Sequence, residues 1–172
     1  MKKCIILLIA VAVVNITAKA QHNHDTVPTN IAKTASVSEL LPLYYSIKDA
    51  LVTGKAEVAA TNASAFVKAI NSIDMKALSE ADHTTFMAVN EKLAIDAAHM
   101  AESKNIATQR HYFKTFSDNF FILAKAVKLS AQPVYQQYCP MKKASWLSSE
   151  AAIKNPYYGS TMLTCGSVKA TL

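Results

Sequence analysis

The sequence predicts an all-α fold, a four-helix up-down bundle that carries a compact irregular C-terminal appendage. Apolar residues recur every three or four positions over most of residues 38–129, which is typical of helices that pack in a bundle. No stretch of useful length alternates apolar and polar residues, as a half-buried strand would. Proline, glycine, the single tryptophan and two cysteines gather near or after residue 133, and this change separates the appendage, residues 134–172. We expect residues 37–172 to form a single domain.

The first twenty residues have the pattern of a cleavable signal peptide. Met1-Lys2-Lys3 is basic, Cys4 to Val14 is apolar, and Ala18-Lys19-Ala20 is a small-x-small cleavage site. Residues 21–36 are polar, so we expect a flexible N-terminal tether. The sequence therefore predicts export, a periplasmic location, and no membrane span after signal cleavage.

Charge and motifs exclude several classes of function. The formal charge of the full chain is +6, and the predicted signal peptide removes three lysines and no acidic residue, which leaves +3. The lysines are scattered rather than gathered in a basic stripe, so we expect no nucleic acid partner. The sequence has no Gly-rich phosphate loop and no G-x-S-x-G, H-E-x-x-H or C-x-x-C-H motif. We therefore predict that the protein is not an enzyme.

The first two helices are predicted from stripes of apolar residues. The first begins near Ser38, an expected N-cap, tolerates Pro42 in its first turn and ends at Gly54. Its stripe consists of Leu40, Tyr44, Ile47 and Leu51. The second covers residues 56–73, and its stripe consists of Val58, Asn62, Phe66, Ile70 and Ile73.

The third and fourth helices show the clearest periods. The third covers residues 79–103, with acidic residues in its first turn and a stripe of Phe86, Val89, Leu93, Ala97 and Met100. The fourth is predicted from the spacing of Ile106, Phe113, Phe116, Phe120, Leu123 and Val127. Gln109 is the one polar residue in that apolar stripe. The helix is expected to end in the segment before Pro133.

Two sulfur pairs mark the appendage, which we expect to contain short helical turns, for example over residues 148–153. Cys139 lies close to Met141 in the chain, and Cys165 lies close to Met162. If the two pairs meet, two thiolates and two thioethers form a pocket that suits Cu(I) or another soft metal. The alternative is a Cys139–Cys165 disulfide that contributes about 3 kcal/mol, with both methionines as core filler. Spacing alone leaves both open, and a reducible disulfide can also be the resting form of a metal site.

Four further residues have two interpretations each. His99 lies late in the third helix and His111 early in the fourth, so a short link would bring them together as second-rank metal ligands, although a helical histidine is more often structural or solvated. Trp146 either caps a cation or anchors the appendage. Arg110, the only arginine, binds a carboxylate or carbonyls of the appendage, or else makes an ordinary surface ion pair.

Several short motifs carry a resemblance to a known family. They are Tyr44 with residues 47–52, Ala98-His99, Gln109-Arg110 with Phe113, residues 138–141, Trp146-Leu147-Ser148, residues 153–159, Met162-Leu163 and Cys165-Gly166. Over residues 38–170 the chain resembles the bacterial domain of unknown function DUF3347. That family is largely helical and exported, and also occurs on periplasmic adaptor subunits of heavy-metal efflux pumps. The resemblance implies a metal-handling role with a periplasmic component of a heavy-metal efflux system as partner.

The sequence thus leads to one hypothesis and one rival. The hypothesis is an exported periplasmic buffer or carrier that binds Cu(I) or a similar soft metal. Its proposed ligands are Cys139, Met141, Met162 and Cys165, with His99 and His111 in second rank. The rival is a metal-free interaction or structural module stapled by the Cys139–Cys165 disulfide.

Overall fold

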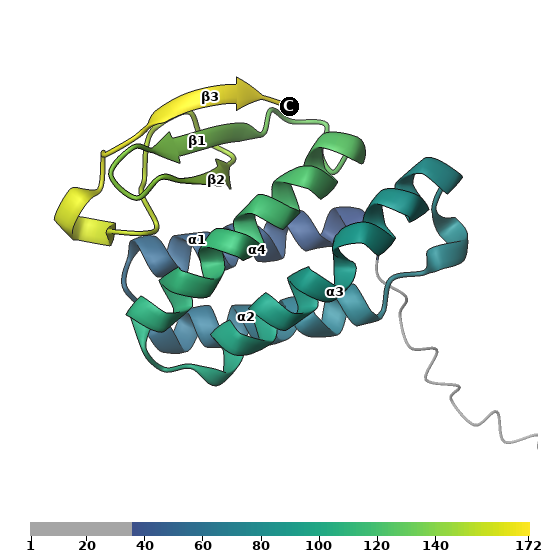
Figure 1. The fold of residues 1–172 in the computed structure, drawn as a ribbon, viewed down its shortest axis with the longest axis horizontal. Helices are drawn as coiled ribbons and strands as arrows, with labels where there is room; N and C mark the ends of the chain where they lie inside the picture. The colour runs from purple at the N-terminus through teal and green to yellow at the C-terminus, as the bar shows by residue number, and fades with distance from the viewer. Residues whose placement is uncertain (1–35) are drawn as a thin grey trace, which may run out of the picture. The chain divides into compact units, whose positions relative to one another are not determined.

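A computed structural model describes residues 36–172 (Figure 1). The predicted signal peptide, residues 1–20, and the predicted tether up to residue 35 lie outside the described residues. The helices are η1 (Val37–Glu39), α1 (Leu40–Val52), α2 (Ala56–Asn71), η2 (Met75–Ala77), α3 (Glu80–Glu102), α4 (Ile106–Ala126) and η3 (Gly159–Met162). The strands are β1 (Tyr135–Cys139), β2 (Ala144–Ser148) and β3 (Ser167–Thr171). No helix in residues 36–172 is long and apolar enough to cross a membrane.

The four predicted α-helices are confirmed, and local signals explain where they begin and end. The Ser79 hydroxyl accepts the Asp82 N–H at the start of α3, and the Asn105 carboxamide accepts two N–H groups at the start of α4. Gly54 follows α1 with a φ of +70°, a left-handed conformation that favours glycine, and Lys55 N–H bonds back to the Ala50 carbonyl. These caps satisfy main-chain groups that a helix leaves open at its ends.

An aromatic cluster forms the centre of the bundle. The Tyr44 ring of α1 stacks on Phe120 of α4 with ring centroids 4.5 Å apart, and Phe66 of α2 meets Phe116 edge to face at 4.8 Å. The predicted stripe of α3 is buried along its whole length. The predicted stripe of α2 is wrong at its start: Val58 is 45% exposed, and the buried face runs through Ala59 and Ala63 instead. Alanine lets neighbouring helices approach closely, so a small residue occupies the buried position and a larger one faces solvent.

The prediction of an all-α fold is wrong, because the C-terminal segment forms a three-stranded antiparallel sheet in the order β2-β1-β3 (Figure 1). Gln137 in the central strand lies opposite Trp146 of β2 and Val168 of β3, and a bulge falls between Gln136 and Gln137. The helical turns expected over residues 148–153 are absent; the only helical turn described in the appendage is η3. Four helices remain the larger part of the described chain.

Each strand lacks the expected apolar alternation for its own reason: β1 buries a glutamine, β2 is buried on both faces, and β3 is mostly exposed. Gln137 is fully buried, and its side-chain NH₂ group donates to the carbonyls of Glu150, Ala151 and Ala152. Trp146 and Leu147 are adjacent in β2 and both are buried. A strand covered on both faces lacks the period of two that marks a half-buried one. The β1–β2 turn also lacks the usual sign, since Lys143 and not glycine or asparagine takes the positive φ of 53°.

Two tyrosine hydroxyls attach β2 to the rest of the molecule. The Leu147 N–H donates to Tyr44 Oη at 2.9 Å, and Tyr44 also hydrogen-bonds to Ser117 of α4. The Tyr157 hydroxyl donates to the Ser145 carbonyl at 2.6 Å. Two main-chain groups of β2, the Leu147 N–H and the Ser145 carbonyl, are therefore satisfied by side chains, and β2 packs beside α4 (Figure 1).

Arg110 joins α1 to the loop before η3. Its Nε donates to the Pro156 carbonyl and its Nη2 donates to the Leu51 carbonyl, both at 2.8 Å. Gly159 lies against this guanidinium with a φ of +57°, and a Cβ there would be 2.6 Å from Arg110 Nη2. The only arginine thus binds a backbone carbonyl of the appendage, that of Pro156, as predicted, and a second carbonyl in α1, that of Leu51.

Candidate functional site

The sheet brings the two cysteines of the appendage together. Cys139 is the last residue of β1, and Tyr138 lies opposite Ser167 of β3. Because β3 begins two residues after Cys165, the antiparallel pairing returns Cys165 to the end of β1. The two Sγ atoms are 3.3 Å apart. The convergence that both sequence-based interpretations require is therefore present.

Hydrogen-bond donors surround the sulfur of Cys139. Burial raises the pKa of this thiol, but hydrogen bonds from the Lys142 and Met141 N–H groups and from the Cys165 and Asn155 side chains outweigh burial, so the pKa lies below its ordinary value. The pKa of Cys165 is raised, chiefly by its hydrogen bond to Cys139. Of the two thiols, Cys139 is therefore the one that loses its proton more readily.

Asn155 holds the loop around the sulfur pair, and the sequence analysis assigned it no role. It is fully buried; its NH₂ group donates to the Cys165 carbonyl at 2.8 Å, and its side-chain oxygen accepts the Tyr157 N–H at 2.9 Å. Its main-chain N–H donates to the Leu163 carbonyl at 2.8 Å. The Asn-Pro dipeptide at 155–156 was the available signal, since it favours a turn.

Trp146 and Gly166 close one side of this loop. Trp146 is 1% exposed, which confirms that it anchors the appendage. A Cβ at Gly166 would lie 2.9 Å from Cη2 of Trp146 and 3.0 Å from the Tyr138 carbonyl, so only glycine lets the chain pass here. The passage matters for the site because Gly166 directly follows Cys165.

The 3.3 Å separation lies between the values that two kinds of chemistry need. A disulfide requires about 2.05 Å between the sulfurs. Two thiolates on one tetrahedral metal with metal–sulfur bonds of about 2.3 Å lie roughly 3.8 Å apart. The sulfur–sulfur distance would have to shorten by about 1.2 Å for a disulfide and lengthen by about 0.5 Å for a shared metal, so the pair lies close to both geometries.

The two methionines lie on the same two turns as the cysteines. Met141 is in the β1–β2 turn and is 65% exposed. Met162 ends η3, is half-buried, and accepts the Cys165 N–H at its carbonyl at 3.1 Å. Their service as thioether ligands stays a prediction.

The two histidines contact the same tyrosine ring and form a group separate from the cysteines. His99 of α3 stacks on Tyr112 of α4 with ring centroids 4.4 Å apart, and His111 meets the same ring edge-on at 5.3 Å. Burial raises the pKa of nearby Asp96, while a hydrogen bond from Thr115 and the two histidines lower it. Within residues 36–172 no three His, Cys, Asp or Glu side chains are grouped to hold a metal, so neither histidine completes a site with the cysteines.

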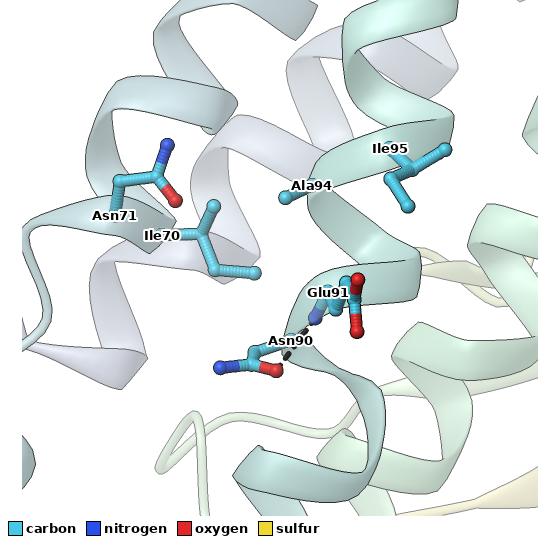
Figure 2. Close-up of a pocket in the computed structure, with 6 residues that line it drawn as sticks. All are labelled: Ile70, Asn71, Asn90, Glu91, Ala94 and Ile95. Carbon is cyan, nitrogen blue, oxygen red and sulfur yellow. Dashed lines mark hydrogen bonds between the residues drawn. The ribbon is translucent and has the colours of Figure 1, made fainter.

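A surface hollow lies between α2 and α3 (Figure 2). Its lining consists of Ile70, Asn71, Asn90, Glu91, Ala94 and Ile95. The Asn90 side-chain oxygen accepts the Glu91 N–H at 2.6 Å, so this amide is occupied locally (Figure 2). One carboxylate and no sulfur or imidazole is a poor set for a metal or a nucleophile, and we assign this hollow no chemistry.

Comparison with known proteins assigns the helices to a family, but the match does not include the two cysteines. The model of a family described as "Protein of unknown function (DUF3347)" matches residues 40–132, more than half of the chain. The match covers α1 to α4 and ends before β1. No curated protein and no solved structure gives a significant match.

Proposed function

This chain belongs to the DUF3347 family, and we propose that it binds a soft metal ion, Cu(I) foremost, through the thiolates of Cys139 and Cys165. It acts as an exported periplasmic buffer or carrier, not as an enzyme, and passes metal to a heavy-metal efflux system. The observation that carries the proposal is the 3.3 Å approach of two sulfurs beside N–H donors that favour a thiolate. The efflux partner rests on the association implied by the family resemblance.

The ligand set favours Cu(I) over zinc. A structural zinc site is closed by four ligands drawn from Cys, His, Asp and Glu, and no such group of three or more occurs in the described part of the chain. Thiolate and thioether ligands select Cu(I), and both kinds are present on these two turns. We propose Cys139 and Cys165 as the primary ligands, with Met141 and Met162 as supplementary ligands.

Titration of the reduced mature protein with Cu(I) against a competing chelator tests this proposal. We expect one equivalent to bind, and we expect Cys139→Ser with Cys165→Ser to abolish binding. Thiols must lose their protons to bind metal, so proton release should accompany the titration. Unchanged Cu(I) affinity in the double variant would exclude the sulfur pair as the site.

Matched variants separate the supplementary ligands from the rest of the protein. Met141→Leu and Met162→Leu keep an apolar side chain of similar size, so reduced affinity would report the thioether itself. His99→Gln and His111→Gln serve as controls on the α3–α4 side, and we expect no change in Cu(I) affinity. A loss in the histidine variants alone would move the site to the helices.

The second candidate function is an interaction or structural module with a Cys139–Cys165 disulfide and no metal. The close sulfurs and the lack of a third Cys, His, Asp or Glu ligand within residues 36–172 favour it. Mass spectrometry of protein taken directly from the periplasm distinguishes the two. A mass two hydrogens lighter, without a metal adduct, supports the module.

A further inference from the structure

The two sulfurs of the pair differ in their access to solvent. Cys139 is fully buried under the β1–β2 turn, whereas Cys165 is half-buried on the link between η3 and β3. They are 3.3 Å apart, so both take part in any bond that forms between them. A reagent from solvent therefore reaches the Cys165 sulfur first.

Attack on one sulfur of a disulfide releases the other sulfur as a thiolate. Because Cys139 is fully buried and Cys165 is half-buried, access favours attack at Cys165 and therefore departure of Cys139.

We propose that Cys139 and Cys165 form a thiol–disulfide exchange pair in which external thiols enter at Cys165 and Cys139 is the sulfur released. An incoming thiolate bonds to Cys165 Sγ, the Cys139–Cys165 bond breaks, and the electron pair leaves on Cys139. A second thiol then attacks the mixed disulfide, gives up its proton to solvent, and leaves a low-molecular-weight disulfide and a Cys165 thiolate. The protein gains two electrons and two thiols lose them; the reverse sequence oxidises the pair with an external disulfide.

The charge of the appendage indicates which thiols react fastest. Residues 134–172 contain four lysines and one acidic residue, Glu150, which pairs with Lys154 at 2.6 Å. Lys142 and Lys143 directly follow Met141 in the turn that covers Cys139, and both are exposed. Their positive charge attracts anions, so the substrate class is anionic thiols, of which glutathione is the probe. This inference goes beyond metal binding and does not depend on it.

Single-cysteine variants test the point of entry. The full chain carries Cys4→Ser throughout, a chelator is present, and oxidised glutathione is added to reduced Cys139→Ser or Cys165→Ser protein. We expect the Cys139→Ser protein, which keeps Cys165, to form its mixed disulfide at least ~10-fold faster, because access limits exchange. In denaturant the two rates should become similar, which shows that the fold causes the difference. Equal rates in the folded state, or a faster Cys165→Ser protein, would overturn the proposal.

The unsubstituted pair provides a second readout that does not depend on how the variants fold. The oxidised Cys4→Ser protein is mixed with glutathione, quenched in acid within milliseconds, digested and mapped by mass spectrometry. We expect glutathione on the Cys165 peptide and a free thiol on the Cys139 peptide. Glutathione on Cys139 would overturn the proposal.

Thiols of different charge test the substrate class. Glutathione should reduce the oxidised protein several-fold faster at low salt than neutral mercaptoethanol or cationic cysteamine, after each rate is corrected for thiolate fraction. Lys142→Gln with Lys143→Gln should remove most of that preference, whereas Lys68→Gln with Lys76→Gln in the bundle should not. No dependence on thiol charge would overturn the assignment to anionic thiols. Because every arm is metal-free, failure here leaves the Cu(I) proposal standing, and success does not require it.

Discussion

The helical bundle and the C-terminal sheet are stabilised by different kinds of contact. In the bundle, buried aromatic and aliphatic side chains from four helices pack together, and position along the stripe matters more than residue identity. In the sheet, single polar side chains bind main-chain groups: Tyr44, Gln137, Asn155 and Tyr157 each make such bonds while buried. Each of these bonds depends on one residue type at one position.

The proposed sites lie in the region that the family match does not reach. The match ends at residue 132, and the sulfur pair lies in the sheet and loop that follow. The bundle supplies a fixed surface through Tyr44 and Arg110, and the appendage supplies the cysteines. The single tryptophan, Trp146, lies in β2, so its fluorescence reports the sheet while far-UV circular dichroism reports the helices.

Removal of a central ring from the bundle should have the largest effect and should affect both regions. Phe120→Ala deletes a fully buried ring that stacks on Tyr44, and we expect the free energy of unfolding to fall by about 3–5 kcal/mol. Urea unfolding followed by circular dichroism and by Trp146 fluorescence should shift together. Ile122→Ala, at a side chain that is 50% exposed, is the control and should cost much less. A Trp146 transition that stays in place would show that the sheet is stable without the bundle.

Loss of the Tyr44 hydroxyl should separate the two regions. Burial keeps this hydroxyl protonated by raising its pKa, and Tyr44→Phe removes it from the Leu147 N–H and from Ser117 while it keeps the ring. A buried N–H without a partner costs about 1–3 kcal/mol. We expect the Trp146 transition to move to lower urea concentration than the helical transition. Tyr45→Phe, on the neighbouring half-buried ring, is the control, and equal shifts in the two variants would contradict the role of the hydroxyl.

The helices were predictable because burial of one helix face repeats the same requirement at every turn. Burial of one face imposes a period of three or four, and the stripe from Phe86 to Met100 is buried as predicted. The exception at Val58 and Ala59 arises because periodicity of large residues misses a face built on alanine. The strands were missed for three reasons. In β1 the buried position is Gln137, whose amide is bound to three carbonyls. Burial on both faces removes the period of two from β2, and β3 is mostly exposed.

The candidate site was predictable only in part. The two cysteines were identified by residue type, and the structure brings them together, although by strand pairing that the all-α prediction did not contain. His99 and His111 approach one aromatic ring, as a short link between antiparallel helices implied, but join no metal-ligand group of the described residues. Asn155 was missed because a single turn residue gives no sign of which distant main-chain groups it will bind.

Arg110 tests the second junction between bundle and appendage with a smaller expected effect. Arg110→Lys keeps the charge, but an ammonium group cannot reproduce the two directed bonds to the Pro156 and Leu51 carbonyls. We expect a loss of about 1 kcal/mol, seen mainly in the Trp146 transition. Lys114→Gln, in an exposed ion pair with Asp118, is the control and should have almost no effect. An equal loss in both variants would mean that Arg110 acts as a general charge.

The smallest effect is expected from removing the charge of Asp96 in the bundle, and this change should leave the sheet unchanged. Burial raises the pKa of Asp96 above its ordinary value of 3.8, although Thr115, His99 and His111 act in the opposite direction. A carboxyl group with a raised folded-state pKa lowers stability because the unfolded chain ionises first, so stability should fall as the pH rises from the unfolded pKa to the folded pKa. Asp96→Asn removes the charge and should raise the melting temperature slightly at pH 7, with no gain well below pH 3.8, where the aspartate is protonated in both states. A gain of equal size at both pH values, measured by circular dichroism, would show that packing and not ionisation limits this position.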